Sequence, residues 1–128
     1  MNILLQILLS IPALVFSVIS IIIAVRLHHL QQQWNFFTEY TRRYHEIMVH
    51  LYDNNNTHHT EYYRLYFDLC SEEYYLHQNK YIPNKVWRSW TDGMRMVMKL
   101  QAGKTVWKIA SQCYDNEFVT FFNRDIIK

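Results

Sequence analysis

Glycine, proline and cysteine are scarce in this chain, which has two of each among its 128 residues. So few glycines and prolines exclude collagen-like and loop-dominated architectures and favour helix. Two cysteines are too few for a disulfide scaffold or a four-cysteine zinc site. The Walker, G-x-G-x-x-G, H-E-x-x-H and G-x-S-x-G motifs are also missing from the sequence. We therefore expect neither an enzyme activity nor a bound cofactor.

Apolar residues, in contrast, are concentrated near the N-terminus. Residues 3–25 contain 18 apolar side chains and no charge, whereas the mean hydropathy of the whole chain is −0.22. A helix of this length spans about 34 Å, enough to cross the hydrocarbon core of a bilayer. A cleaved signal peptide would need a basic N-terminal region, a shorter apolar core and a small-x-small cleavage site, which this segment lacks. The sequence therefore predicts a retained transmembrane anchor over residues 1–25.

The charges that flank this anchor predict its orientation. Arg26, Arg42 and Arg43 follow it, and no Lys or Arg precedes it. Because cytoplasmic flanks of membrane helices carry an excess of positive charge, residues 26–128 are expected to form a cytosolic helical domain. Unpaired cysteines suit that reducing compartment. We therefore expect a single-pass protein of the cell inner membrane with a cytoplasmic C-terminal domain.

One face of the predicted anchor consists of small or polar residues, which we call the small-residue seam. Its members recur at spacings of four and three residues and so share one side of a helix: Gln6, Ser10, Ala13, Ser17, Ser20 and Ala24. Small side chains let two membrane helices approach closely and associate. The seam therefore predicts a homo-oligomer or a membrane-protein partner. The alternative is that each serine only bonds a carbonyl of its own helix.

Helical spacing of apolar residues continues beyond the anchor, and neither Gly nor Pro interrupts residues 26–52. We expect one long helix that leaves the membrane, a turn at 53–59, and further helices at 61–78, 83–100, 104–114 and 115–126. Asn79 is the expected left-handed cap of the second helix, and residues 101–103 are the expected break before the fourth. Nothing alternates as a strand would. The predicted fold class is all-α, with a single N-terminal transmembrane helix continuing into a small helical bundle.

Charge is segregated within the cytosolic part. Residues 80–108 carry a formal charge of +6, and residues 53–79 carry −4. Four basic side chains share one face of the predicted third helix and form what we call the basic surface: Lys85, Arg88, Arg95 and Lys99. This surface could be simply solvated, could meet the anionic lipid of the membrane, or could meet the acidic helix of a neighbour. No reader motif accompanies it, so no nucleic acid is expected.

Histidine, cysteine and aromatic residues offer few further sites. Two Glu-x-x-x-His pairs, at Glu46 and at Glu73, would lie far apart in a helical hairpin, so we interpret them as residues of polar helix faces and expect no metal. Cys70 and Cys113 lack a basic neighbourhood and are expected to be small buried side chains. Twenty aromatic residues follow residue 25. We expect them to form a packed core rather than a stacking surface for bases.

Residues 61–126 resemble a bacterial family with no assigned function, whose members have one N-terminal membrane helix and a small aromatic-rich helical domain. The resemblance is carried by residues 62–65, 69–76, 81–83 and 115–118, together with Trp87 and Trp90. It implies the same anchor and fold. It supplies no catalytic residue.

Two functions follow from these patterns as hypotheses. The first is a membrane-anchored helical interaction or accessory protein that self-associates or joins a larger membrane complex. The alternative is a small membrane-perturbing effector, of toxin or defence type, that acts through an oligomerised anchor. Membrane lipid is the expected partner in both.

Overall fold

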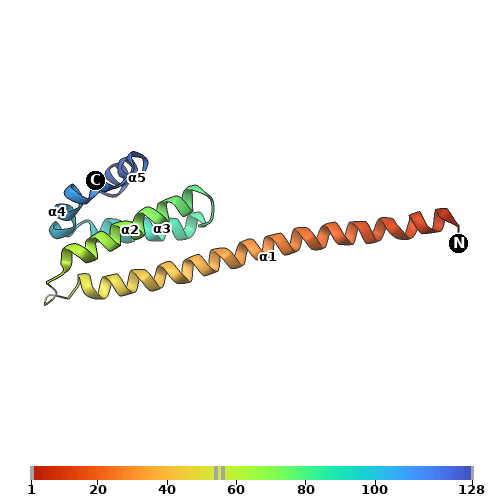
Figure 1. The fold of residues 1–128 in the computed structure, drawn as a ribbon, viewed down its shortest axis with the longest axis horizontal. Helices are drawn as coiled ribbons and strands as arrows, with labels where there is room; N and C mark the ends of the chain where they lie inside the picture. The colour runs from red at the N-terminus through yellow and green to blue at the C-terminus, as the bar shows by residue number, and fades with distance from the viewer. Residues whose placement is uncertain (1, 54, 56, 128) are drawn as a thin grey trace. The chain divides into compact units, whose positions relative to one another are not determined.

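The computed structural model describes residues 2–53, 55 and 57–127 and is 86% helical, with no strand in these segments. The predicted all-α class is therefore confirmed. Figure 1 shows the helices in chain order. They are α1 (Ile3–Leu51), α2 (His59–Gln78), α3 (Asn84–Val97), α4 (Gln101–Ala110) and α5 (Asn116–Phe121), with a 3₁₀ turn at Ser111–Cys113 and a π-helical turn at Phe122–Ile126.

The chain divides into two compact units, Met1–Trp34 and Asn35–Lys128. In the first unit, all described residues up to Gln31 are exposed. Pro12 lies inside α1 without ending it. Within the described residues, α1 is the one helix that is long and apolar enough to cross a membrane. The expected end of the anchor at residue 25 concerns the membrane boundary and stays a prediction.

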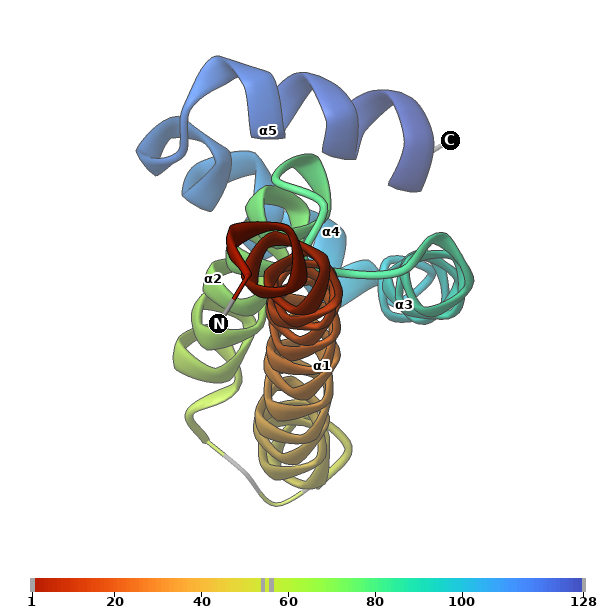
Figure 2. The same ribbon diagram turned by 90° about the vertical axis from the view of Figure 1, so that its right-hand side faces the viewer.

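The second unit is a bundle with an aromatic core. Segment 35–51 of α1 contacts α2 through Tyr40 and α3 through Phe37, and Figure 2 shows α2 and α3 on different sides of this segment. At the centre, the Trp107 ring of α4 lies 4.9 Å from Phe67 of α2 and 4.3 Å from Phe122, centroid to centroid. Phe67 and Phe122 are fully buried. The expected aromatic core is therefore confirmed.

The loop between α2 and α3 differs from the prediction in its left-handed residue. Asn79 has a φ of −85° and a side-chain amide that donates to the Tyr75 carbonyl oxygen at 2.9 Å. Lys80 instead adopts the left-handed conformation, with a φ of 63°. The Asn79 prediction was wrong by one residue, because this side chain satisfies the end of α2 without a positive φ.

Gly103 was predicted to break the chain but lies inside α4 and is buried. The break falls at residues 98–100, just before α4 begins at Gln101. A Cβ atom on Gly103 would lie 3.0 Å from Cε1 of Tyr63 on α2. This glycine therefore lets α4 approach α2 closely, and its role is packing rather than chain reversal.

The start of the last helix agrees with the sequence. Asp115 precedes α5, and its side chain accepts a hydrogen bond from the Phe118 backbone N–H at 3.0 Å. Such a cap satisfies one of the free N–H groups at a helix start. The same carboxylate accepts a hydrogen bond from the Tyr75 hydroxyl, so the cap also joins α5 to α2.

Candidate functional site

A cavity of about 280 Å³ lies between segment 35–51 of α1, α2 and α3. We call it the aromatic cavity. Aromatic rings from all three helices form most of its wall. The Trp90 ring lies parallel to Phe37 across the α1–α3 contact, with centroids 6.5 Å apart. The wall is made of Phe37, Tyr40, Thr41, Tyr44, His45, Tyr66, Glu73, Ser89, Trp90 and Gly93.

Helical spacing brings these side chains to the same place. Phe37, Tyr40 and Tyr44 recur at three and four residues on α1 and so line one face. On α2, Tyr66 and Glu73 are separated by two helical turns. Gly93 of α3 leaves open space, because a Cβ atom there would meet nothing within 4 Å.

Glu73 is the unusual member of this wall, because it is an acidic residue and is only 5% exposed. Burial raises the pKa of its carboxyl group from 4.5 to about 8, although the positive charge of Arg43 acts in the opposite direction. In the described part of the chain, no group donates a hydrogen bond to this carboxyl. In the same part of the chain, the one side-chain nitrogen or oxygen atom that is both closed off from solvent and without a hydrogen-bond partner is Nδ1 of His77. The Glu73 oxygens also have no donor but are not closed off in this way, so they reach solvent-accessible space. That space is the aromatic cavity, which Glu73 lines.

The neighbouring carboxylate, Glu72, has the opposite environment. Arg43 places its Nη1 2.5 Å from Oε2 of Glu72, and the Tyr40 hydroxyl donates to the same oxygen at 2.9 Å. The Arg43 guanidinium also lies over the Tyr40 ring, 5.2 Å from its centroid. Hydrogen bonding from Arg43 holds the pKa of Glu72 below its usual value. Two adjacent glutamates thus differ: Glu72 is ionised and paired, and Glu73 keeps its proton near neutral pH.

The small-residue seam lies entirely in the first unit, and all six of its members are exposed. Its serine hydroxyls are already satisfied within α1. Ser17 and Ser20 donate to the carbonyls four residues earlier at 2.8 Å, and Ser10 donates to the Ile7 carbonyl at 2.9 Å. A contact along this seam would therefore depend on close backbone approach rather than on serine hydrogen bonds between chains.

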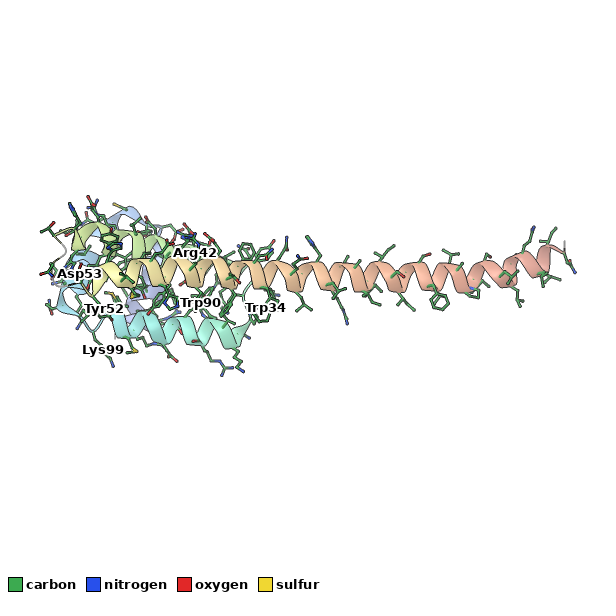
Figure 3. All side chains as sticks on the ribbon, turned by 90° about the horizontal axis from the view of Figure 1, so that it is seen from below. Trp34, Arg42, Tyr52, Asp53, Trp90 and Lys99 are labelled. Atoms are coloured by element: carbon green, nitrogen blue, oxygen red, sulfur yellow. The ribbon has the colours of Figure 1, made fainter. Side chains whose placement is uncertain are left out.

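The four residues of the basic surface are all exposed on or just after α3, and Figure 3 shows Lys99 near the end of that helix. Arg95 is engaged within the domain, since it pairs with Asp92 at 2.8 Å and its Nε donates to the Asp125 carbonyl at 3.0 Å. Within the described ranges, Lys85, Arg88 and Lys99 form no ion pair. The sequence thus overestimated the free basic surface by one residue.

The acidic segment is largely used inside the domain. Glu72 pairs with Arg43, Glu73 is buried, and Asp68 accepts a hydrogen bond from the Tyr114 hydroxyl at 2.5 Å. Charge segregation in the sequence therefore does not mean that a free acidic face awaits the basic surface of another copy.

Several single-residue expectations need correction. Cys70 is buried as expected, but Cys113 is exposed. Glu73 is not on a polar face, whereas Glu46 is exposed and pairs with Arg42 at 2.6 Å. Among the residues that the structure describes, no group of three His, Cys, Asp or Glu side chains could hold a metal ion.

Sequence reasoning missed the aromatic cavity, although one signal for it was present. Glu73 follows Leu69 by four residues, Cys70 by three and Tyr66 by seven. That spacing places a carboxylate in the buried stripe of α2.

Comparisons with protein-family models, with curated proteins and with solved structures give no match to this chain.

Proposed function

We propose that this chain is a single-pass membrane-anchored helical interaction protein, which self-associates or serves as an accessory subunit of a larger membrane complex. The observation that carries the proposal is the exposure of the apolar stretch 3–25. Every residue of this stretch is exposed. A continuous apolar surface of this length is unfavourable in water and is stable in a bilayer.

The flanking charges complete the proposed topology. Arg26, at the end of the apolar stretch, and Arg42 and Arg43 beyond it favour a single-pass topology in the cell inner membrane, with residues 26–128 in the cytoplasm. Lys85, Arg88 and Lys99, which form no ion pair with the described residues, then offer three cations to the anionic leaflet or to an acidic partner. Lipid is favoured over a second copy of the chain, because three of the four acidic groups of α2, Asp68, Glu72 and Glu73, are already engaged or buried.

Self-association through the small-residue seam can be tested in a bacterial membrane with a dimerisation-dependent reporter. Ser17→Leu places a large side chain in the seam and should reduce the signal. Val15→Leu is the matched control, because at 100° per residue it lies on the opposite face of the helix. Equal signals from wild type and both variants would contradict a seam-mediated contact.

The same expression experiment separates the proposal from the alternative effector. An anchored interaction protein should leave growth and membrane potential unchanged. Rapid loss of membrane potential that Ser17→Leu abolishes would instead favour a membrane-perturbing protein. We also propose that the chain belongs to the bacterial family that residues 61–126 resemble. The resemblance alone supports this, because no family model matches the chain.

A further inference from the structure

The aromatic cavity has a composition that a purely structural gap between helices does not require. Its volume of about 280 Å³ is close to the lower end of small-molecule sites. The rings of Phe37, Tyr40 and Trp90 form its α1–α3 side, with Trp90 6.0 Å from Tyr40 between centroids. Aromatic faces carry partial negative charge and attract cations.

Glu73 adds a full negative charge to this wall when it ionises. Leaving a carboxyl group buried without a hydrogen bond is costly, and a hydrophobic residue of similar size would be more stable there. The carboxylate of Glu72, one residue earlier, does receive hydrogen bonds, from Arg43 and from the Tyr40 hydroxyl. Such bonds let a carboxylate contribute to the stability of the fold. Glu73 has no such donors in the described structure and opens onto the cavity. A ligand that supplies positive charge would complete it.

We propose that the aromatic cavity binds a small organic ammonium ion, with Glu73 as its counter-ion and the rings of Trp90, Tyr40 and Phe37 around its charged end. The cavity is too small for a peptide, and its single carboxyl group repels anions. A bare metal ion is disfavoured, because rings rather than oxygen ligands line most of the wall. The ammonium group could belong to a free amine or to a lipid headgroup.

Binding would be coupled to proton release from Glu73. Around this carboxyl lie Tyr40, Arg43, Tyr44 and His45 of α1, and Tyr66, Cys70 and Glu72 of α2, whereas α3 contributes Ser89, Trp90 and Gly93, none of them charged. Burial raises the pKa values of Tyr66 and Cys70 well above their usual values, so both stay neutral. Arg43 and Glu72 neutralise each other. Affinity for a cation should therefore rise with pH up to about 8, the pKa of Glu73. Glu73→Gln should remove the counter-ion at every pH.

The test is calorimetric titration of the full chain in a non-ionic maltoside detergent with choline chloride and with ethanolamine hydrochloride. At least one of these probes should bind, more tightly at pH 8.5 than at pH 6. Glu73→Gln should weaken binding about tenfold or more, and Trp90→Leu should weaken it measurably. Lys85→Gln, which lies outside the cavity, should bind like wild type.

The source of the ammonium group is tested in lipid nanodiscs. If phosphatidylcholine or phosphatidylethanolamine discs reduce probe binding and phosphatidylglycerol discs do not, the site binds a headgroup. If all discs allow equal probe binding, it binds a free amine. The proposal is overturned if wild type binds neither probe, or if Glu73→Gln binds them as wild type does. Circular dichroism of each variant checks that the bundle is intact.

Discussion

Arg43 of α1 and Glu72 of α2 form an ion pair across the first helix contact of the bundle, with Nη1 2.5 Å from Oε2. The pair lies beside the Glu73 carboxyl, whose pKa is raised by burial, lowered by the charge of Arg43 and raised by the charge of Glu72. One cation therefore serves two adjacent glutamates in different ways: it pairs with one and moderates the cost of ionising the other.

Replacing Arg43 with Met should destabilise the bundle by about 0.5–1 kcal/mol, since both partners are partly exposed and solvent screens their attraction. Glu72→Gln should cost a similar amount. The double variant should lose less than the sum, because each single change already breaks the pair. Thermal unfolding of the full chain in detergent, followed by near-ultraviolet circular dichroism of the aromatic core, measures these values. Strictly additive losses would show that the pair contributes nothing.

Stability should fall as pH rises across the range set by Glu73. In the unfolded chain its pKa is about 4.5, and in the folded chain about 8, so the folded state binds the extra proton between these values. The ionisation of Glu73 therefore costs no stability below about pH 4.5, costs progressively more up to pH 8, and costs a constant amount above pH 8. Since each pKa unit corresponds to about 1.4 kcal/mol, the full loss is a few kcal/mol.

Glu73→Gln should remove this pH dependence, because the amide has the same shape and no proton to lose. At pH 8.5 the variant should unfold at a higher temperature than wild type, and near pH 4.5 the two should be similar. Glu72→Gln is the neighbouring control and should not stabilise the protein at high pH. A lower melting temperature for Glu73→Gln than for wild type at pH 8.5 would contradict this assignment of the buried charge.

The two glycines should respond differently to the same substitution. Gly93→Ala should be neutral or stabilising by about 0.5–1 kcal/mol, because alanine favours helix and its methyl group meets open space. Gly103→Ala should destabilise by about 1–2 kcal/mol, because its methyl group would lie 3.0 Å from Tyr63, which is only 2% exposed and cannot move away freely. Equal melting temperatures for the two variants would show that α4 does not pack tightly on α2.

Charge reversals within the basic surface should have different effects on stability, depending on whether the residue bonds to the rest of the domain. Reversing Lys85 and Arg88 to Glu should change stability by less than about 0.5 kcal/mol, because both side chains are exposed. Arg95→Glu should cost more, since it removes the bonds to Asp92 and to the Asp125 carbonyl. If the surface meets anionic lipid, the Lys85 and Arg88 reversal should also weaken association with phosphatidylglycerol membranes at low salt. Equal stability losses from both reversals would contradict the distinction.

The helices could be predicted from the sequence, because their capping residues and the spacing of their apolar residues match the ends and buried faces that they have in the fold. The long uninterrupted run of α1, the Asp115 cap and the aromatic core each follow from residues that act locally or by burial. Errors arose where one residue has two possible roles. Gly103 can end a helix or admit a close neighbour, and only the position of Tyr63 shows which role applies.

The aromatic cavity could not be predicted in the same way. It depends on three helices that meet, and on Glu73 lying at a buried position where an apolar residue was the natural expectation. Charge totals were misleading for the same reason. Five acidic residues in 53–79 suggest a free acidic face, yet pairing across helices and burial use three of them inside the domain.

Membrane anchoring with a cytoplasmic bundle is the central claim, and a C-terminal reporter fusion tests it most directly. In a bacterial host, alkaline phosphatase fused to the C-terminus of the full chain is active only if that end reaches the periplasm. A cytoplasmic C-terminus predicts an inactive phosphatase fusion, and a fluorescent protein fused at the same position should be bright and full-length in the membrane fraction. An active phosphatase, or a shortened fusion released from the membrane after loss of residues 1–25, would contradict the proposed anchoring and orientation.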